Sequence, residues 1–345
     1  MNPKRLVVLI LFLLLISACS NNDTERVSQD LRKKVIEQEK ISSNEAKYRF
    51  PLTGIATREP ATNRIVSVMI NNHPAARPQS GLSQADLVFE LLAEGQTTRF
   101  LAMFQSEKPE VVGPVRSARP YYFKLANDYN ALYIYHGAAD HIEAMLRSGA
   151  VDHLNGSYYD NDGYLFKRES FRSAPHNSYL NFAAVTEVAT NQGYEVEADH
   201  RSLAFYQSDQ LADLTGDKGS EVSFNYGQET VRYRYDPTIE AYLRYNGDQQ
   251  TVEFTDQTPI QLNNVFIIET AHQVIDDQGR REIDLMSGGN AYLLQKGFIN
   301  KVQWQNTDGY IVPVKDGKEV PFVPGKTWIN VIPTNPGLTG VTVIE

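Results

Sequence analysis

The chain has 345 residues, of which 41% are hydrophobic and 22% charged, enough for two domains with cores of their own. Its net charge of −9 argues against nucleic acid as a partner, because an acidic chain repels phosphates and any anion site must be a local basic cluster. The single cysteine, Cys19, excludes an internal disulfide and a zinc–thiolate cluster.

The first predicted element is a lipoprotein signal peptide over residues 1–18. Lys4 and Arg5 form a positive start, residues 6–16 are apolar, and small residues precede Cys19. An uncleaved anchor is the poorer alternative, because this run rises only about 16 Å as a helix and a hydrocarbon core is about 30 Å thick. We predict that Cys19 carries acyl chains such as palmitate, which would anchor the protein on the outer face of the bacterial cytoplasmic membrane.

Residues 19–49 are predicted to be the lipidated cysteine and a flexible tether. The segment is rich in Asn, Ser, Gln, Glu and Lys and mixes both signs of charge. A second interpretation takes Val27, Leu31 and Val35 as one face of a short helix that pairs with a partner helix. Either structure would hold the folded part of the chain away from the lipid surface.

The first folded domain is predicted over residues 50–199 as α/β, because apolar strand patterns alternate with helical ones. Strands are expected at residues 65–70, 87–92, 100–104 and 131–135, and helices at residues 118–127, 140–147 and 181–192. Ser117 is the expected cap of the first helix. Polar side chains follow these strands, where sheets of this class usually hold ligands.

The second domain, residues 200–345, is predicted to be mainly antiparallel β. Its apolar runs are short and separated by turns, among them one expected strand at residues 251–254. Asp316-Gly317 lies between two such runs and predicts a β-hairpin. Trp304 and Trp328 could mark a binding face, but packing in the core is the favoured interpretation.

Five segments resemble one family. They are FELLAEGQTTRF (89–100), GPVRSARPYY (113–122), APHN (174–177), GGNAYLLQKG (288–297) and PGKTWINVIP (324–333). In this order they resemble the YerB-like family of bacterial lipoproteins, whose two halves are domains of unknown function. The resemblance covers almost everything after the tether. It implies lipid anchoring and, by association, a role in the cell envelope beside the proteins of cell-wall synthesis.

The GPVRSAR segment is the best candidate for binding an anion. Arg116 and Arg119 flank Ser117 at a predicted helix start, where free N–H groups and the helix dipole favour negative charge. In the alternative interpretation, both arginines pair with Glu90, Glu94 or Glu110 and hold the domain together. The full candidate set for ligand binding is Arg99, Arg116, Ser117, Arg119, His136, His176 and Asn177.

Glu90 and Glu94 are the candidate catalytic residues. Two nearby carboxylates can act as acid and base, as in glycosidases, although two ordinary solvated glutamates would show the same spacing. A cell-wall-active hydrolase or transferase using Glu90, Glu94 or His136 is therefore the alternative to a protein that only binds. No nucleophile-elbow pattern surrounds Ser117, and an enzyme is the less favoured reading.

No metal or cofactor is predicted. His136, Asp140 and His141 offer too few ligands in helical geometry, and residues 160–163 resemble a calcium loop but favour a β-turn, since Tyr158 stands at its first ligand position. No phosphate loop or dinucleotide fingerprint is present in the sequence. We predict a binding or adaptor module for cell-wall synthesis proteins or an anionic wall polymer. Its oligomeric state is left open.

Overall fold

The computed structural model of the protein describes residues 46–345. The predicted signal peptide, Cys19 and the helical stripe in the tether lie outside the described residues. Residues 49–55 together with 60–345 form one compact unit, which is called the larger unit below. Near the start of the described chain, β1 (Tyr48–Arg49) and β2 (Ala56–Thr57) form a two-stranded sheet. Within residues 46–345, no helix has the length and apolar character needed to cross a bilayer.

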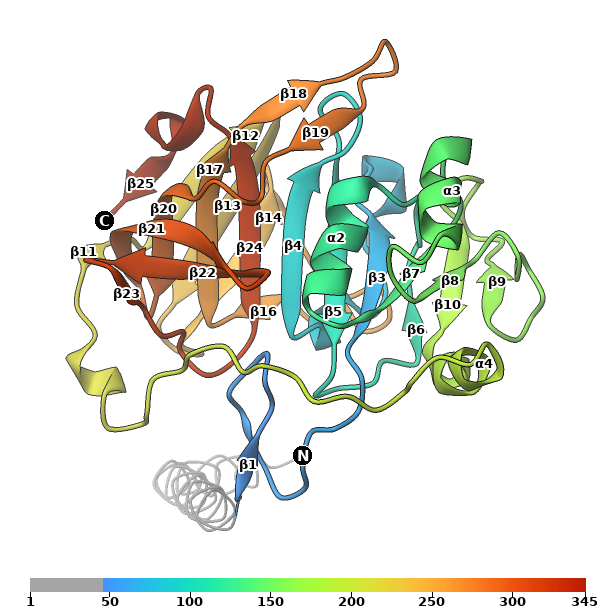
Figure 1. The fold of residues 1–345 in the computed structure, drawn as a ribbon. Helices are drawn as coiled ribbons and strands as arrows, with labels where there is room; N and C mark the ends of the chain where they lie inside the picture. The colour runs from blue at the N-terminus through green and yellow to red at the C-terminus, as the bar shows by residue number, and fades with distance from the viewer. Residues whose placement is uncertain (1–45) are drawn as a thin grey trace, which may run out of the picture. The chain divides into compact units, whose positions relative to one another are not determined.

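A mixed sheet of 12 strands runs through the larger unit in the order β23-β22-β21-β20-β17-β24-β4-β5-β3-β7-β8, with β11 beside β21 (Figure 1). Its centre is parallel, since β24 pairs in parallel with both β17 and β4. The bounds are β3 (Val66–Asn71), β4 (Leu87–Leu92), β5 (Thr98–Phe104), β7 (Leu132–Tyr135), β8 (His153–Asn155), β11 (Asp217–Lys218), β17 (Asn264–Thr270), β20 (Gly289–Gln295), β21 (Phe298–Thr307), β22 (Tyr310–Lys315), β23 (Lys318–Glu319) and β24 (Thr327–Pro333).

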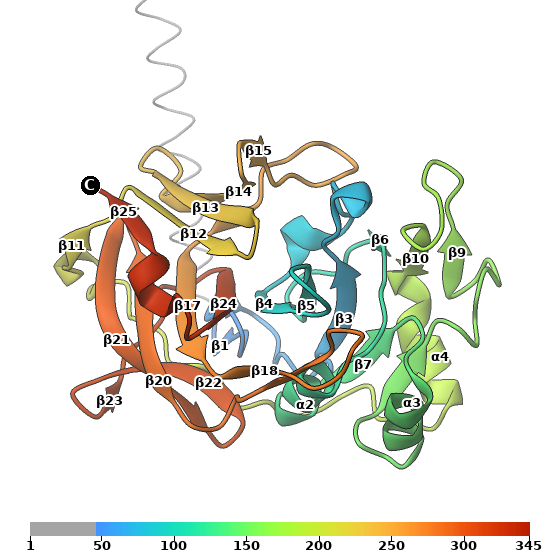
Figure 2. The same ribbon diagram turned by 90° about the horizontal axis from the view of Figure 1, so that it is seen from above.

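A second sheet of six strands is antiparallel and packs on one face of the first (Figure 2). Its strands are β12 (Glu221–Tyr226), β13 (Glu229–Asp236), β14 (Ala241–Asn246), β15 (Gln249–Gln250), β16 (Gln261–Leu262) and β25 (Thr342–Ile344). The remaining strands are β6 (Val111–Val112), β9 (Phe166–Arg168) and β10 (Ser178–Asn181), in a three-stranded sheet, and the hairpin β18 (His272–Val274) with β19 (Arg281–Ile283).

Helices are few and short within residues 46–345. The α-helices are α2 (Pro120–Asp128), α3 (Asp140–Arg147) and α4 (Val185–Asn191), and the 3₁₀ turns are η1 (Pro74–Ala76), η2 (Leu82–Gln84), η3 (Phe182–Ala184), η4 (Leu211–Asp213) and η5 (Gly337–Gly340). Buried residues of α2 and α3 pack on the face of the large sheet opposite the six-stranded sheet. Strands β3, β4 and β5 are therefore covered on both faces, which explains their nearly continuous apolar sequences.

The side chains of β4 alternate between these two cores, because successive residues of a strand point to opposite faces. Leu87, Phe89 and Leu91 face the helices, whereas Val88 and Leu92 face the six-stranded sheet. By the same alternation, Glu90 points its carboxylate into the core between the two sheets. This placement decides the role that the structure gives to Glu90.

Most predicted elements of the first half are confirmed, and α3 has the predicted bounds. The expected cap of α2 is wrong. The helix begins at Pro120 with Arg119 as its cap, because proline has the backbone angle and the missing N–H that suit the first helical position. The helix expected at residues 181–192 begins only at Val185, after a 3₁₀ turn.

In the second half, the expected strand at residues 251–254 is wrong, because that segment forms a loop with isolated bridges. The hairpin at Asp316-Gly317 is confirmed, with positive φ of 53° and 75° at these two residues. The core interpretation of Trp304 and Trp328 is also confirmed, since both are fully buried.

The described chain is mostly sheet with few helices, and its sheets are mixed or antiparallel. The α/β class of the first domain and the boundary at residues 199 and 200 remain predictions. Strands from both sides of that boundary share the large sheet through the pairing of β24 with β4.

Candidate functional site

A cluster of arginines lies where β4 ends and β5 begins. The Glu94 carboxylate, just after β4, accepts a 2.7 Å hydrogen bond from Arg99 Nη2 and pairs with Arg119. Arg99 also donates to the Ser117 carbonyl over 2.7 Å. Burial lowers the pKa of both guanidiniums. The ion pair predicted between Arg119 and Glu94 is therefore present, and Glu94 also pairs with Arg99, for which no such pair was predicted.

Arg116 is held differently. Its backbone N–H donates to Met69 O over 2.9 Å, so the segment after Gly113 lies alongside β3. Its guanidinium makes no hydrogen bond or ion pair with another described residue. Burial and, secondly, the positive charge of Arg99 lower the pKa of Arg116. Arg116 is thus a partly buried cation without a counter-charge in the described chain.

His73, which follows β3, and His176, which precedes β10, form two stacked imidazoles with ring centroids 4.6 Å apart. The Asn71 side-chain oxygen accepts from His73 N over 3.0 Å, which directs the Asn71 amide toward His176 Nδ1 at 2.8 Å. His176 Nδ1 is therefore the acceptor, and the neutral ring carries its proton on Nε2. His73 Nδ1 accepts from Ala75 N over 3.2 Å, which fixes the same tautomer. Both rings thus have an Nε2–H donor to offer.

Electrostatics connects His176 to Arg116. Burial lowers the pKa of His176, and electrostatic interaction with His73, Arg116 and Arg172 lowers it further. These neighbours disfavour a positive charge on the His176 ring, and an anion placed among them would favour it. We call Arg116, His73 and His176 the cationic site.

His136 and Asn177 belong to a neighbouring network. Arg168 donates to both oxygens of Asp160, at 2.7 and 2.9 Å, and to the Asn177 side-chain oxygen at 2.9 Å. His136 Nε2 lies 3.3 Å from Asp160 Oδ1, while its backbone N–H donates to Arg116 O over 3.0 Å. The pKa of His136 is lowered by burial, against the opposing effect of Asp160. The network therefore supports the backbone of the cationic site.

The calcium-like stretch at residues 160–163 is a turn. Asp162 Oδ1 accepts from the N–H groups of Tyr164, Leu165 and Phe166, and Asp160 is occupied by Arg168. Within the described chain, no group of three or more His, Cys, Asp or Glu side chains could hold a metal ion.

Glu90 is fully buried and forms an ion pair with Arg244 of β14. Arg244 Nη2 lies 2.9 Å from each carboxylate oxygen, and Trp328 Nε1 and Thr98 Oγ1 donate to the same carboxylate at 3.0 and 2.9 Å. The guanidinium lies 5.0 Å from the Trp328 ring centroid and 5.3 Å from that of Phe100. Glu90 therefore faces a closed core, whereas Glu94 serves the arginine cluster, and neither carboxylate has the free setting that a catalytic pair requires.

An open groove of about 820 Å³ borders the arginine cluster. It lies between α2 and the β18–β19 hairpin, which stand next to each other in Figures 1 and 2. Arg281 lines the groove and donates to Gly95 O over 2.5 Å, directly beside Glu94. Tyr121 lines it from α2 and donates to Leu92 O over 2.8 Å. Aromatic and basic side chains thus extend from the arginine cluster into a hollow of ligand size.

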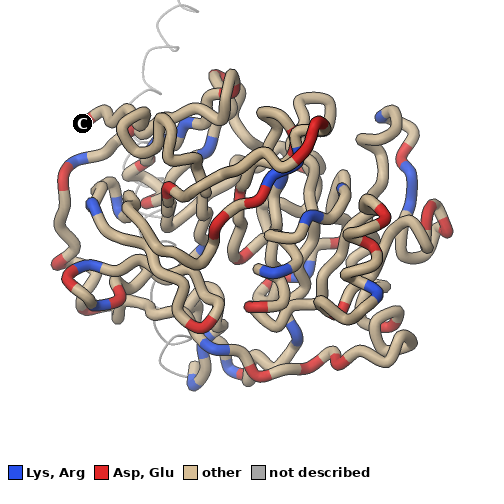
Figure 3. Tube along the Cα trace, turned by 45° about the horizontal axis from the view of Figure 1, so that its top comes forward, with Lys and Arg blue, Asp and Glu red and all other residues tan. Residues whose placement is uncertain are grey.

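Charges of both signs are interspersed along the described chain (Figure 3). Such mixing gives no broad field that would attract a polyanion, so a local group of cations must do so. The cationic site and the arginine cluster are such a group, because they contain Arg99, Arg116 and Arg119 against the single carboxylate of Glu94.

With this fold and this site, the chain belongs to the DUF3048 family. Residues 52–195 match the family described as "Protein of unknown function (DUF3048) N-terminal domain", and residues 220–329 match its C-terminal domain. The chain is 44% identical to the Bacillus subtilis (strain 168) protein described as "Putative lipoprotein YerB" over 302 residues, which cover 86% of this chain and 90% of that relative.

A solved structure agrees with the fold. The crystal structure of YerB protein from Bacillus subtilis superimposes with a TM-score of 0.79 at 43% identity, over 87% of this chain and all of that one. The family resemblance found in the sequence is confirmed.

Three important residues were missed by the sequence analysis. His73 was left out of the candidate set, although it follows a buried strand at one of the polar strand ends where ligands were expected. Arg244 stands in the run Ala-Tyr-Leu-Arg-Tyr-Asn, where a charge among aromatic strand residues suggests a buried partner. Arg281 had no signal, because its importance comes only from the position of the hairpin.

Proposed function

We propose that this protein is a membrane-anchored, extracytoplasmic lipoprotein that binds an anionic envelope polymer, or an acidic segment of a cell-wall synthesis protein, at the cationic site. Lipidation at Cys19 is supported by the signal pattern and by the description of the Bacillus subtilis relative as "Putative lipoprotein YerB". The observation that carries the binding role is Arg116, a partly buried guanidinium without a partner among the described residues.

A phosphate or carboxylate suits this arrangement for a physical reason. A guanidinium binds such groups through two parallel hydrogen bonds, and two imidazole N–H groups beside it can bind further oxygens. A cation that is buried without a counter-charge costs free energy, and a bound anion returns part of that cost. Tyr121 and the groove beside it would accommodate the apolar faces of a polymer repeat.

The alternative, a wall-active hydrolase or transferase, has less support. Glu90 is enclosed by Arg244 and Trp328, and Glu94 is held by two arginines. A general acid or base must reach the proton that it transfers. We therefore propose binding without chemistry.

Arg116→Ala is expected to weaken binding of an anionic polymer at least about tenfold, which corresponds to about 1.4 kcal/mol. The full chain in lipid nanodiscs is titrated with soluble poly(glycerol phosphate), and the dissociation constant is read by biolayer interferometry. Arg147→Ala, on the exposed last turn of α3, is the matched control and should leave the constant unchanged. Unchanged binding in the double variant Arg116→Ala, Arg119→Ala would exclude this site.

Binding at the cationic site is also expected to strengthen as the pH falls from 8 to 6. The free site lowers the pKa of His176, while a bound anion favours the protonated imidazole and raises it. Protons are then taken up on binding, so affinity rises toward acidic pH. His176→Gln should flatten this dependence. An equally steep pH profile in that variant would assign the effect to another group.

Mass spectrometry of the same mixtures separates binding from catalysis. Intact polymer is expected after long incubation. New fragments that disappear in a Glu94→Gln variant would overturn the binding proposal in favour of an enzyme. If the polymer does not bind at all, cell-wall synthesis proteins become the expected partners.

A further inference from the structure

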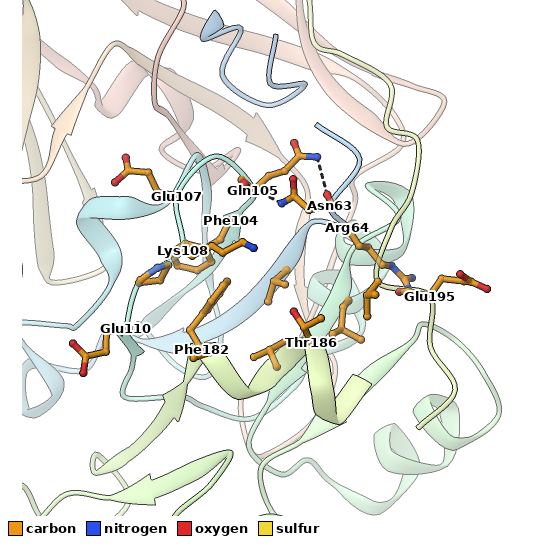
Figure 4. A pocket seen from close by; sticks show the side chains of 16 residues that line it. Asn63, Arg64, Phe104, Gln105, Glu107, Lys108, Glu110, Phe182, Thr186 and Glu195 are labelled. Carbon is orange, nitrogen blue, oxygen red and sulfur yellow. Dashed lines mark hydrogen bonds between the residues drawn. The ribbon is translucent and has the colours of Figure 1, made fainter. Parts of the chain in front are cut away.

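A cavity of about 420 Å³ lies at the far end of β3 and β7 from the cationic site. It is lined where β3 and β7 begin and β5 ends, and η3 and α4 close one side (Figure 4). Its floor is apolar and consists of Val66, Phe104, Leu132, Phe182 and Val185. The volume is in the range of cavities that hold small molecules.

Hydrogen bonds hold the walls of this cavity in place. The Asn63 side-chain amide donates to Gln105 O over 3.0 Å, and Gln105 Nε2 donates back to Asn63 O over 3.1 Å. Arg64 is held by Asp152 at 2.7 Å. The rings of Phe104 and Phe182 meet edge to face, with centroids 5.4 Å apart. The hollow is therefore formed before any ligand enters, which reduces the entropic cost of binding.

Around the cavity, a positively charged side chain points inward and the negatively charged ones point outward. Figure 4 shows the Lys108 side chain extending across the cavity, while the carboxylates of Glu107, Glu110 and Glu195 point outward. Glu107 is already paired with Lys326 at 2.8 Å. Lys108 has no hydrogen bond or ion pair with another described residue. One ammonium group without a partner thus stands over an apolar floor.

We propose that this cavity binds a small organic monoanion, a carboxylate with an apolar aliphatic or aromatic body. The body would lie on Phe104, Phe182 and the valines, and the carboxylate would pair with Lys108. Arg64 is already paired with Asp152, so Lys108 is the one lining cation without a partner among the described residues. It favours a single negative charge, because a dianion would bring an uncompensated charge to an apolar surface. A phosphate without an apolar body would leave the floor in contact with water. This second site is independent of the cationic site.

The proposal is tested with 3-(4-fluorophenyl)propanoate as the probe and its neutral carboxamide as the matched ligand. Fluorine NMR line broadening measures both dissociation constants on the full chain in nanodiscs, and empty nanodiscs give the background. We expect the carboxylate to bind at least about tenfold more tightly than the amide. Lys108→Gln should abolish that difference without changing the melting temperature, because Lys108 holds no other described residue.

A second variant tests the location. Ala183 lies on the exposed rim of the cavity, so Ala183→Trp should fill the entrance and remove binding of both probes while the fold persists. Lys315→Gln, an exposed lysine of β22, is the control for general charge and should bind like the wild type.

Three results would overturn the proposal. The first is that the carboxylate does not bind to the wild type. The second is that Lys108→Gln binds the carboxylate as tightly as the wild type does, and the third is that Ala183→Trp does so. Arg116→Ala should not affect either probe. Failure of this proposal can therefore be distinguished from failure of the polymer-binding proposal.

Discussion

Arg244→Met is expected to lower the free energy of unfolding by about 3–5 kcal/mol, the usual cost of removing one member of a buried ion pair. Both members are fully buried, so the variant leaves the Glu90 carboxylate in the core with neutral hydrogen-bond donors only. Burial lowers the pKa of Arg244, but the interactions with Glu90 and Tyr233 together outweigh burial and raise that pKa. Urea denaturation, followed by fluorescence of the buried Trp304 and Trp328, measures the loss.

The double variant Glu90→Gln, Arg244→Met separates the charge from the packing. Its carboxamide oxygen still accepts a hydrogen bond, and no charge is left in the core, so it should recover much of the stability lost in Arg244→Met. Arg232→Met is the control, because its guanidinium is partly exposed and its carboxylate partners are 3.5 and 3.8 Å away. Such pairs contribute about 0–1 kcal/mol. If the double variant is no more stable than Arg244→Met, the uncompensated charge of Glu90 is not the cause of the lost stability.

Acid is expected to destabilise the protein through His272 in β18. Burial, assisted by the positive charge of Arg281, lowers the pKa of His272 to about 4 from its ordinary 6.5. The ring donates from Nδ1 to Thr270 O over 3.0 Å, and its other nitrogen is buried without a partner in the described chain. The folded protein therefore keeps this imidazole neutral.

The sign of this pH dependence of stability follows from the protons that His272 binds in the folded and unfolded chains. The unfolded chain binds a proton near pH 6.5 and the folded chain only near pH 4, so this stabilisation is complete above pH 6.5 and is lost as the pH falls through that window. The loss by pH 4 is on the order of 3 kcal/mol. Urea denaturation at pH 7 and pH 4 should show a smaller difference for His272→Gln than for the wild type or for His141→Gln, an exposed control. Equal differences in all three proteins would contradict this role.

Local patterns predicted the strands and helices well where the local signal was strong. The continuous apolar runs of β3 and β4 and the polar and apolar spacing of α3 depend on nearby residues only, and the structure has them close to the expected bounds. The prediction that Ser117 caps α2 was wrong. Pro120 occupies the first helical position, so Arg119 is the cap.

The site was predicted only where its residues are close together in the sequence. Arg116 and Arg119 were recognised because they are close in sequence, and Glu94 was named among their possible partners. The partner of Glu90 could not be found in the same way, because Arg244 is 154 residues away and reaches it only when β14 packs over β4. The tautomers of His73 and His176 depend on Asn71 and on a backbone N–H of η1, and these groups meet only in the folded chain.

The pairing of β24 with β4 affects how the chain can fold during synthesis. β4 belongs to the first half of the chain and β24 to its last residues, yet they exchange backbone hydrogen bonds in the middle of the large sheet. While the chain is being synthesised, β4 is available long before β24 emerges, and the edge of β4 that pairs with β24 stays unpaired in the meantime. An unpaired apolar edge is a template for aggregation. The first half alone is therefore an incomplete folding unit, and truncation before β24 should give insoluble protein and not a smaller working module.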